Sequence, residues 1–244
     1  MTGFDPQESH QVEPERREFV YANLEVVRQR IRAAAAAAGR SPDDVTLVVI
    51  TKTYPSDDIR LLASLGVTEV GENRLSELLE KGPIAQTLGL RVHAVGRIQS
   101  NKAKRFARAA DVIHSVDRVD LVAPLDRGRT QSGLAPLPVL IQVSLDGDPQ
   151  RGGVLPAGLG ALADEIETAP GLVLSGVMAV APLGVDPEAA FAGLATAAER
   201  VRRVRPEATW VSAGMSGDLE AAIHHGATHV RVGAAVLGSR PPVR

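Results

Sequence analysis

Short apolar, β-branched segments alternate with helix-like segments from residue 46 to the end of the chain. The strand-like segments are residues 46–52, 67–71, 91–96, 112–116, 138–144, 172–180, 209–213 and 228–233. The intervening segments carry apolar residues at helical spacing or helix-start signals, such as Asp186-Pro187-Glu188. Strands that alternate with helices form parallel sheets covered by those helices. About eight such units in 244 residues predict an α/β fold, a single (β/α)8 TIM barrel. A doubly wound open sheet is the alternative.

The segment before the first strand predicts an extra N-terminal helix. Its apolar residues from Val20 to Ile31 are spaced four, three and four apart and so share one face. Residues 1–16 are polar and contain two prolines, which predicts a disordered tail and not a signal peptide. Residues 17–244 show no break in composition, so we expect one domain there. No run approaches the ~20 apolar residues of a membrane-spanning helix.

Composition excludes several classes of function. The formal net charge of -2 gives no case for a nucleic-acid or membrane partner, and the basic run over residues 102–108 is interpreted as a solvated helix face. The absence of cysteine excludes disulfides and cysteine metal sites, and it fits the cytoplasm. His224 and His225 are adjacent, about 100° apart on a helix, and predict no metal site. We expect a monomer.

Lys52 is the first candidate functional residue, because it closes the first predicted strand. The carboxyl ends of barrel strands are where such folds place their chemistry. A partly desolvated amine there has a lowered pKa and can form a Schiff base with a carbonyl. The alternative is an ordinary lysine that leaves the sheet edge for water.

Two small, glycine-rich segments follow the predicted seventh and eighth strands, namely residues 212–217 and 231–234. Barrels often bind phosphate at this place through backbone N–H groups, and Ser216 is expected to cap the following helix. Ordinary turn chemistry is the alternative interpretation. His93 and His114 lie within predicted strands and are interpreted as hydrogen-bonded core histidines.

These residues, taken together, give the chain a clear family resemblance. It resembles the pyridoxal 5′-phosphate (PLP) homeostasis proteins, the YggS/PROSC-like family, along most of the chain from about residue 20 to 240. The matching segments include Thr51-Lys52-Thr53, Val70-Gly71-Glu72-Asn73, Val92-His93-Ala94-Val95-Gly96-Arg97-Ile98-Gln99-Ser100-Asn101-Lys102, Ile113-His114-Ser115-Val116-Asp117, Gly176-Val177-Met178-Ala179, Ser212-Ala213-Gly214-Met215-Ser216-Gly217-Asp218 and Val230-Arg231-Val232-Gly233.

The resemblance implies a barrel of the alanine racemase N-terminal type that binds PLP. Lys52 matches the Schiff-base lysine, Arg231 the arginine at the pyridine nitrogen, and Asn73 a residue beside the ring. The phosphate cradle is matched by Ser212, Ser216 and Gly233, with backbone N–H groups of Gly214 and Met215. The chain departs from the family pattern at Ala94, Arg97, Ala213 and Ala234, which changes details of the pocket and leaves the lysine in place.

The resemblance leaves three hypotheses for function. The first is a PLP carrier or regulator in vitamin B6 and amino-acid homeostasis, without robust catalysis and with apo PLP-dependent enzymes as partners. An arginine at the pyridine nitrogen disfavours ring protonation, and the chain ends soon after the last strand, where a racemase needs a further domain. The second is a PLP-dependent racemase or lyase in which Tyr54 or His93 transfers the proton. The third is a lysine Schiff-base aldolase without a cofactor.

Overall fold

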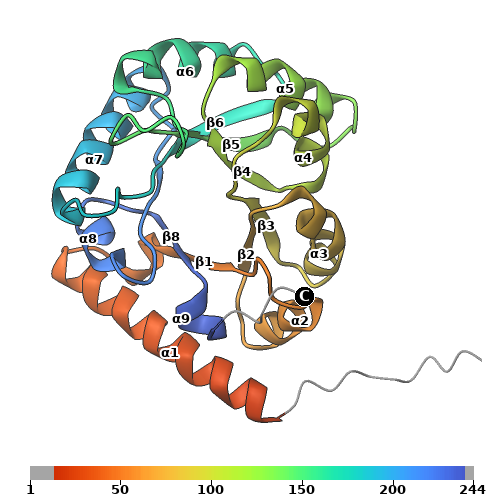
Figure 1. Ribbon diagram of the computed structural model, residues 1–244, viewed down its shortest axis with the longest axis vertical. Coiled ribbons are helices and arrows are strands. Elements are labelled where there is room, and N and C mark those ends of the chain that lie inside the picture. Colours follow the sequence, from red (N-terminus) through yellow and green to blue (C-terminus); the bar gives the residue numbers. More distant parts are fainter. Residues whose placement is uncertain (1–13, 240–244) are drawn as a thin grey trace, which may run out of the picture.

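The computed structural model describes residues 14–239 and contains a closed barrel of parallel strands ringed by helices (Figure 1). Neighbouring strands in the chain are neighbours in the barrel, and β8 closes it by pairing with β1. The strands are β1 (Thr46–Ile50), β2 (Glu69–Glu72), β3 (Arg91–Ala94), β4 (Val112–Val116), β5 (Leu137–Gln142), β6 (Leu172–Met178), β7 (Trp210–Ser212) and β8 (His229–Val232). The predicted (β/α)8 barrel is therefore confirmed, and the open sheet is wrong.

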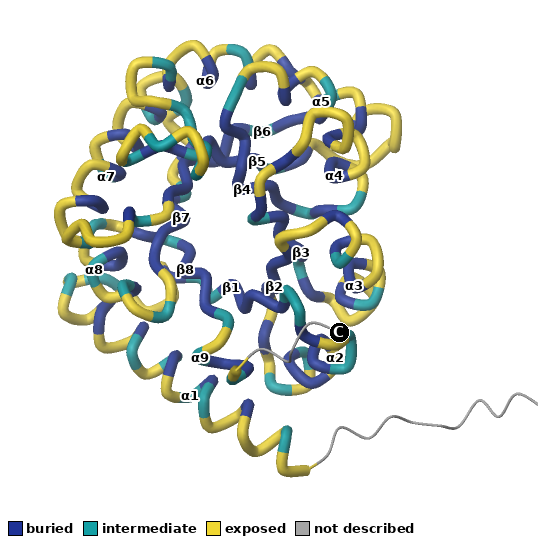
Figure 2. Tube along the Cα trace, viewed as in Figure 1, coloured by how far each residue is buried: buried dark blue, intermediate teal, exposed yellow. Residues whose placement is uncertain are grey.

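The helices form the outer layer, and the buried positions concentrate on the strands and on the inward helix faces (Figure 2). They are α1 (Pro14–Ala37), α2 (Ser56–Ser64), α3 (Leu75–Thr87), α4 (Ala103–Ala109), α5 (Val122–Thr130), α6 (Leu159–Glu167), α7 (Pro187–Val204), α8 (Leu219–His224) and α9 (Ala234–Leu237). Short 3-10 turns occupy Pro42–Asp44, Ser100–Lys102, Val119–Leu121 and Pro156–Gly158. No helix in residues 14–239 is long and apolar enough to cross a membrane.

The predicted N-terminal helix is present as α1, which packs beside α8 and α9 (Figure 1). Its apolar face from Val20 to Ile31 is buried, as expected from the spacing. The helix begins at Pro14, before the predicted domain boundary at residue 17. Arg16 explains this start, because its guanidinium binds the Asp58 carboxylate at 2.8 Å and the Leu237 carbonyl at 2.9 Å. The rest of the predicted tail, residues 1–13, lies outside the described residues.

Three helix boundaries expected from the sequence were wrong, namely the end at Gly82-Pro83 and the N-caps at Ser56 and Ser216. We expect α3 to end at Gly82-Pro83 from the sequence, but it continues to Thr87, where Ala85 is buried against the core. Ser56 is the first residue of α2 and not its cap, since its hydroxyl donates to Glu80. Asp218, not Ser216, is the N-cap residue of α8.

Candidate cofactor site at the barrel mouth

The closed parallel barrel brings most predicted site residues to its carboxyl end. Ser212 ends β7, Arg231 lies in β8, and Lys52 follows β1, so three adjacent strands supply them. Val49 pairs with Val232, and a Cβ at Gly233 would lie 3.2 Å from the carbonyl oxygen of Ile50. Lys52 is half-buried, whereas Ser212 and Arg231 are buried. These side chains thus form one candidate site.

The segment around Lys52 is held in an uncommon conformation. Thr53 has φ of 70°, a left-handed value that β-carbon sterics disfavour outside glycine. The Thr53 N–H donates to the Glu77 carboxylate at 2.6 Å, and the Thr51 carbonyl accepts from the Lys81 ammonium at 2.8 Å. Both neighbours of Lys52 are therefore fixed by side chains of α3. Strained backbone that is held in this way is common at functional sites.

A buried charge cluster behind Lys52 supplies these bonds, and sequence reasoning did not find it. The Lys81 ammonium lies 3.1 Å from Glu72 and 3.4 Å from Glu77, and its side chain is 4% exposed. Burial raises the pKa of Glu72, although the Thr51 hydroxyl and the Lys81 charge oppose that shift. From the sequence we expect Glu72 among the polar groups at the mouth, and a helix from about Arg74 to Lys81. Lys81 is three residues after the buried Leu78 and four before the buried Ala85, so it lies on the inward face of α3.

Replacing Lys81 by methionine is expected to lower the free energy of unfolding by about 3–5 kcal/mol, because the buried Glu72 carboxylate loses its cation. Urea unfolding monitored by circular dichroism measures this loss. The matched control is Lys104→Met, at an exposed position of α4, which we expect to change stability by less than about 0.5 kcal/mol. Equal stabilities for the two variants would contradict the role given to the cluster.

Arg231 is the cation deepest in the site. One terminal nitrogen donates to the Ser212 hydroxyl at 2.6 Å, and the other donates to the Ala179 carbonyl at 2.8 Å. Burial lowers the pKa of Arg231 to about 10, and the charge of Asp218 partly offsets that shift. The guanidinium therefore stays protonated at neutral pH and is fixed in one orientation.

A chain of hydrogen bonds connects Arg231 to the opposite end of the barrel interior. Arg231 donates to the Ser212 hydroxyl, and that hydroxyl is hydrogen-bonded to Nδ1 of His114 at 2.9 Å. Nε2 of His114 is hydrogen-bonded to Nδ1 of His93 at 2.7 Å, and Nε2 of His93 is bonded to the Glu69 carboxylate. The interpretation of His93 and His114 as hydrogen-bonded core histidines is thereby confirmed.

The loop after β7 is the segment that the sequence predicts to hold a phosphate. Gly214 has φ of 89°, and a Cβ there would lie 2.8 Å from the Cβ of Ala222, so only glycine fits. The N–H of Met215 is one of the amides predicted to bind phosphate. In this structure it donates to the Asp218 carboxylate at 2.6 Å. Ser216 is half-buried in the turn before α8, and Gly233 precedes α9.

The donor set fits a phosphorylated aldehyde with a ring nitrogen. Lys52 offers the amine, Arg231 a fixed N–H donor, and the two glycine-rich loops offer amides and the Ser216 hydroxyl. Thr53 Oγ1 and Glu72 Oε2 are buried and have no hydrogen-bond partner within residues 14–239. Unpaired buried polar atoms beside Lys52 are consistent with a polar ligand nearby.

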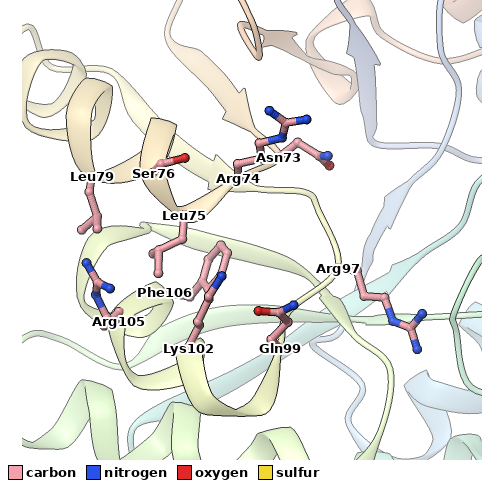
Figure 3. Close-up of a pocket in the computed structure, with 10 residues that line it drawn as sticks. All are labelled: Asn73, Arg74, Leu75, Ser76, Leu79, Arg97, Gln99, Lys102, Arg105 and Phe106. Atoms are coloured by element: carbon pink, nitrogen blue, oxygen red, sulfur yellow. The ribbon is translucent and has the colours of Figure 1, made fainter.

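Asn73 directly follows β2 and so stands at the rim of the mouth, whereas the histidine pair 224–225 belongs to a separate surface position. Asn73 is exposed after β2 and lines a cavity between α3 and α4 together with Arg97 (Figure 3). His224 and His225 lie on the surface, as expected. One ring nitrogen of His224 and one of His225 nevertheless bond the same oxygen of Glu188, at 3.1 and 2.8 Å. This is possible because α8 ends at His224, so His225 no longer has helical backbone angles.

Comparison with known proteins agrees with this geometry. Residues 22–241 match the family described as alanine racemase, N-terminal domain. The pyridoxal phosphate homeostasis protein of Mycobacterium tuberculosis is 42% identical over 246 residues, with 93% of this chain and 95% of that protein covered. The protein of the same name from Escherichia coli is 37% identical and covers 89% of this chain and 95% of its own length.

A solved structure shows the same architecture with a cofactor. PipY of Synechococcus elongatus, with PLP bound, is 32% identical and superposes with a TM-score of 0.78, covering 90% of this chain and 100% of PipY. From the domain match and the identity to these relatives, the chain belongs to the pyridoxal phosphate homeostasis protein family, built on the alanine racemase N-terminal domain.

Proposed function

We propose that this chain binds PLP through a Schiff base to Lys52 and acts as a reversible PLP carrier in vitamin B6 homeostasis. The observation that carries the proposal is the buried Arg231 guanidinium, held by Ser212 and Ala179 on the strands next to Lys52. Apo PLP-dependent enzymes are the proposed recipients. The names of the relatives and the PLP in PipY support the choice of cofactor.

The permanent charge of Arg231 fits a PLP carrier better than a PLP-dependent catalyst. PLP supplies an electron sink when bound, and that sink is strongest when the ring nitrogen is protonated. An arginine that remains charged donates a hydrogen bond to this nitrogen and repels a second positive charge. Arg231 keeps its proton at neutral pH, since its pKa is about 10. Ser212 fixes the guanidinium through its hydroxyl in this proposal.

The phosphate of the cofactor is proposed to lie between the two loops that follow β7 and β8. The Ser216 hydroxyl and the amides of Gly214 and Gly233 would hold it. Met215 contributes its amide once the Asp218 carboxylate gives up that bond. Asn73 is proposed to lie beside the ring, at the rim of the mouth.

The two groups considered for proton transfer in a racemase or lyase are already engaged. The Tyr54 hydroxyl donates to the carbonyl of Gly238 at 2.6 Å. Both ring nitrogens of His93 are bonded inside the barrel, to His114 and Glu69. A general acid or base has to reach the proton that it transfers. These bonds hold the Tyr54 and His93 side chains on protein partners instead.

The PLP-loaded protein is expected to exchange the α-proton of common amino acids with D₂O at a rate close to that of free PLP. Proton NMR of alanine and glutamate in D₂O measures this exchange, and a visible absorbance band verifies that PLP is bound. A colourless protein under these conditions would favour the cofactor-free aldolase. Rapid deuterium incorporation would favour the racemase or lyase.

A further inference from the structure

A cationic cavity lies outside the barrel interior, between α3 and α4. Its volume is about 480 Å³, which is within the range of small-molecule sites. Lys102 and Arg105 stand on one wall, with Ser76 and Leu79 of α3 on the other (Figure 3). Arg74 stands at the edge of the cavity, just before α3.

The positive charge of this cavity is not compensated by protein groups. No aspartate or glutamate is among its lining residues within the described range. Arg74, Lys102 and Arg105 are all exposed, and none of them pairs with a carboxylate in residues 14–239. Arg97 also lines the cavity but is directed away from the other cations in Figure 3, toward Asp117 at 3.9 Å. Three cations without a carboxylate partner around one concave surface make that surface attractive to an anion.

The remaining lining groups favour a compact organic anion. Leu75 and Phe106 are largely buried, and Leu79 is 39% exposed, so the wall between the cations is apolar. The Ser76 hydroxyl and the Gln99 amide add hydrogen-bond donors. A phosphate group can bind the cations and these donors, while a small apolar group covers Leu79.

We propose that this cavity is a second ligand site, which binds a small organic phosphate ester. A nucleic acid is the less suitable occupant, because Phe106 is buried and no exposed aromatic residue lines the cavity for base stacking. A volume of this size also suits a small molecule. Of the residues proposed to hold the cofactor, Asn73 also lines this cavity, whereas Lys52, Ser212 and Arg231 do not, so the second site does not depend on the proposed Schiff base.

Amide NMR of the full chain, titrated with phenyl phosphate, tests the proposal. We expect saturable shifts of the Ser76, Gln99 and Lys102 amides, with a Kd of about 1 mM or lower, weakening as ionic strength rises. The double variant Lys102→Gln/Arg105→Gln should bind at least about tenfold more weakly. The matched control is Lys104→Gln, which removes an exposed charge of the same helix that does not line the cavity. It should bind as the unmodified chain does.

Three outcomes would overturn the proposal. Shifts confined to Gly214, Ser216 and Gly233 would place the phosphate in the cofactor loops instead. Equal weakening by Lys104→Gln would show only general charge attraction. A polyglutamate peptide that binds while phenyl phosphate does not would make the cavity a protein-docking site. A failure of PLP to bind Lys52 changes none of these readouts, so the two proposals fail separately.

Discussion

Replacing Lys52 by alanine is expected to abolish the absorbance band of bound PLP and leave the barrel folded. In the proposed function the ε-amine is the only covalent link to the cofactor, so its removal leaves only phosphate and ring contacts. Lys52 is half-buried and follows the last residue of β1. Truncation there should therefore cost less than about 1 kcal/mol of unfolding free energy.

Absorbance spectra after incubation with PLP and gel filtration measure this loss, and borohydride reduction followed by mass spectrometry measures covalent attachment. Lys104→Ala is the matched control, because it removes an exposed lysine of α4 that none of the proposed cofactor contacts uses. The control should keep the full band and the reducible adduct. A reducible adduct of equal yield in the Lys52→Ala chain would refute the assignment of this lysine.

The position of Lys52 could be predicted because it depends on local signals. A β-branched run followed by a turn places its last residues at the carboxyl end of a strand, and all eight strands were located from such runs. Arg231 and Gly233 could be located for the same reason. In a closed parallel barrel, strand order along the chain fixes which ends are neighbours.

The contacts between side chains could not be predicted, since they depend on register and on helix rotation. The bond from His93 to His114 joins β3 and β4, and that from His114 to Ser212 crosses to β7. No local sequence pattern specifies how far along the barrel axis each of these side chains lies. Lys81 was missed for a similar reason: it shares the inward face of α3 with Leu78 and Ala85, and that face continues through Pro83, which the sequence favours as a helix end.

The buried histidines predict marked loss of stability in mild acid. Burial lowers the pKa of His114 well below its usual range, and the neighbouring charges of His93 and Arg231 add to that shift. Burial likewise lowers the pKa of His229 to about 4, with His93 adding to the shift and Glu69 opposing it. Both rings therefore stay neutral in the folded chain at pH values where an unfolded histidine binds a proton.

The sign of the effect follows from proton linkage. Between pH 6.5 and 4 the unfolded chain takes up protons that the folded chain does not, so the free energy of unfolding falls as the pH falls. His229 alone should remove about 2 kcal/mol between pH 7 and pH 5. His114 acts in the same direction.

Urea unfolding at pH 7, 6 and 5 measures this dependence. His229→Gln cannot take up the proton, so it should flatten the decline by about 2 kcal/mol even if the variant is less stable at pH 7. His224→Gln is the matched control, since that ring is on the surface with a side chain 67% exposed. It should leave the decline unchanged. A decline that persists in full in His229→Gln would mean that this ring is already protonated in the folded barrel near neutral pH, which its burial and the nearby guanidinium of Arg91 oppose.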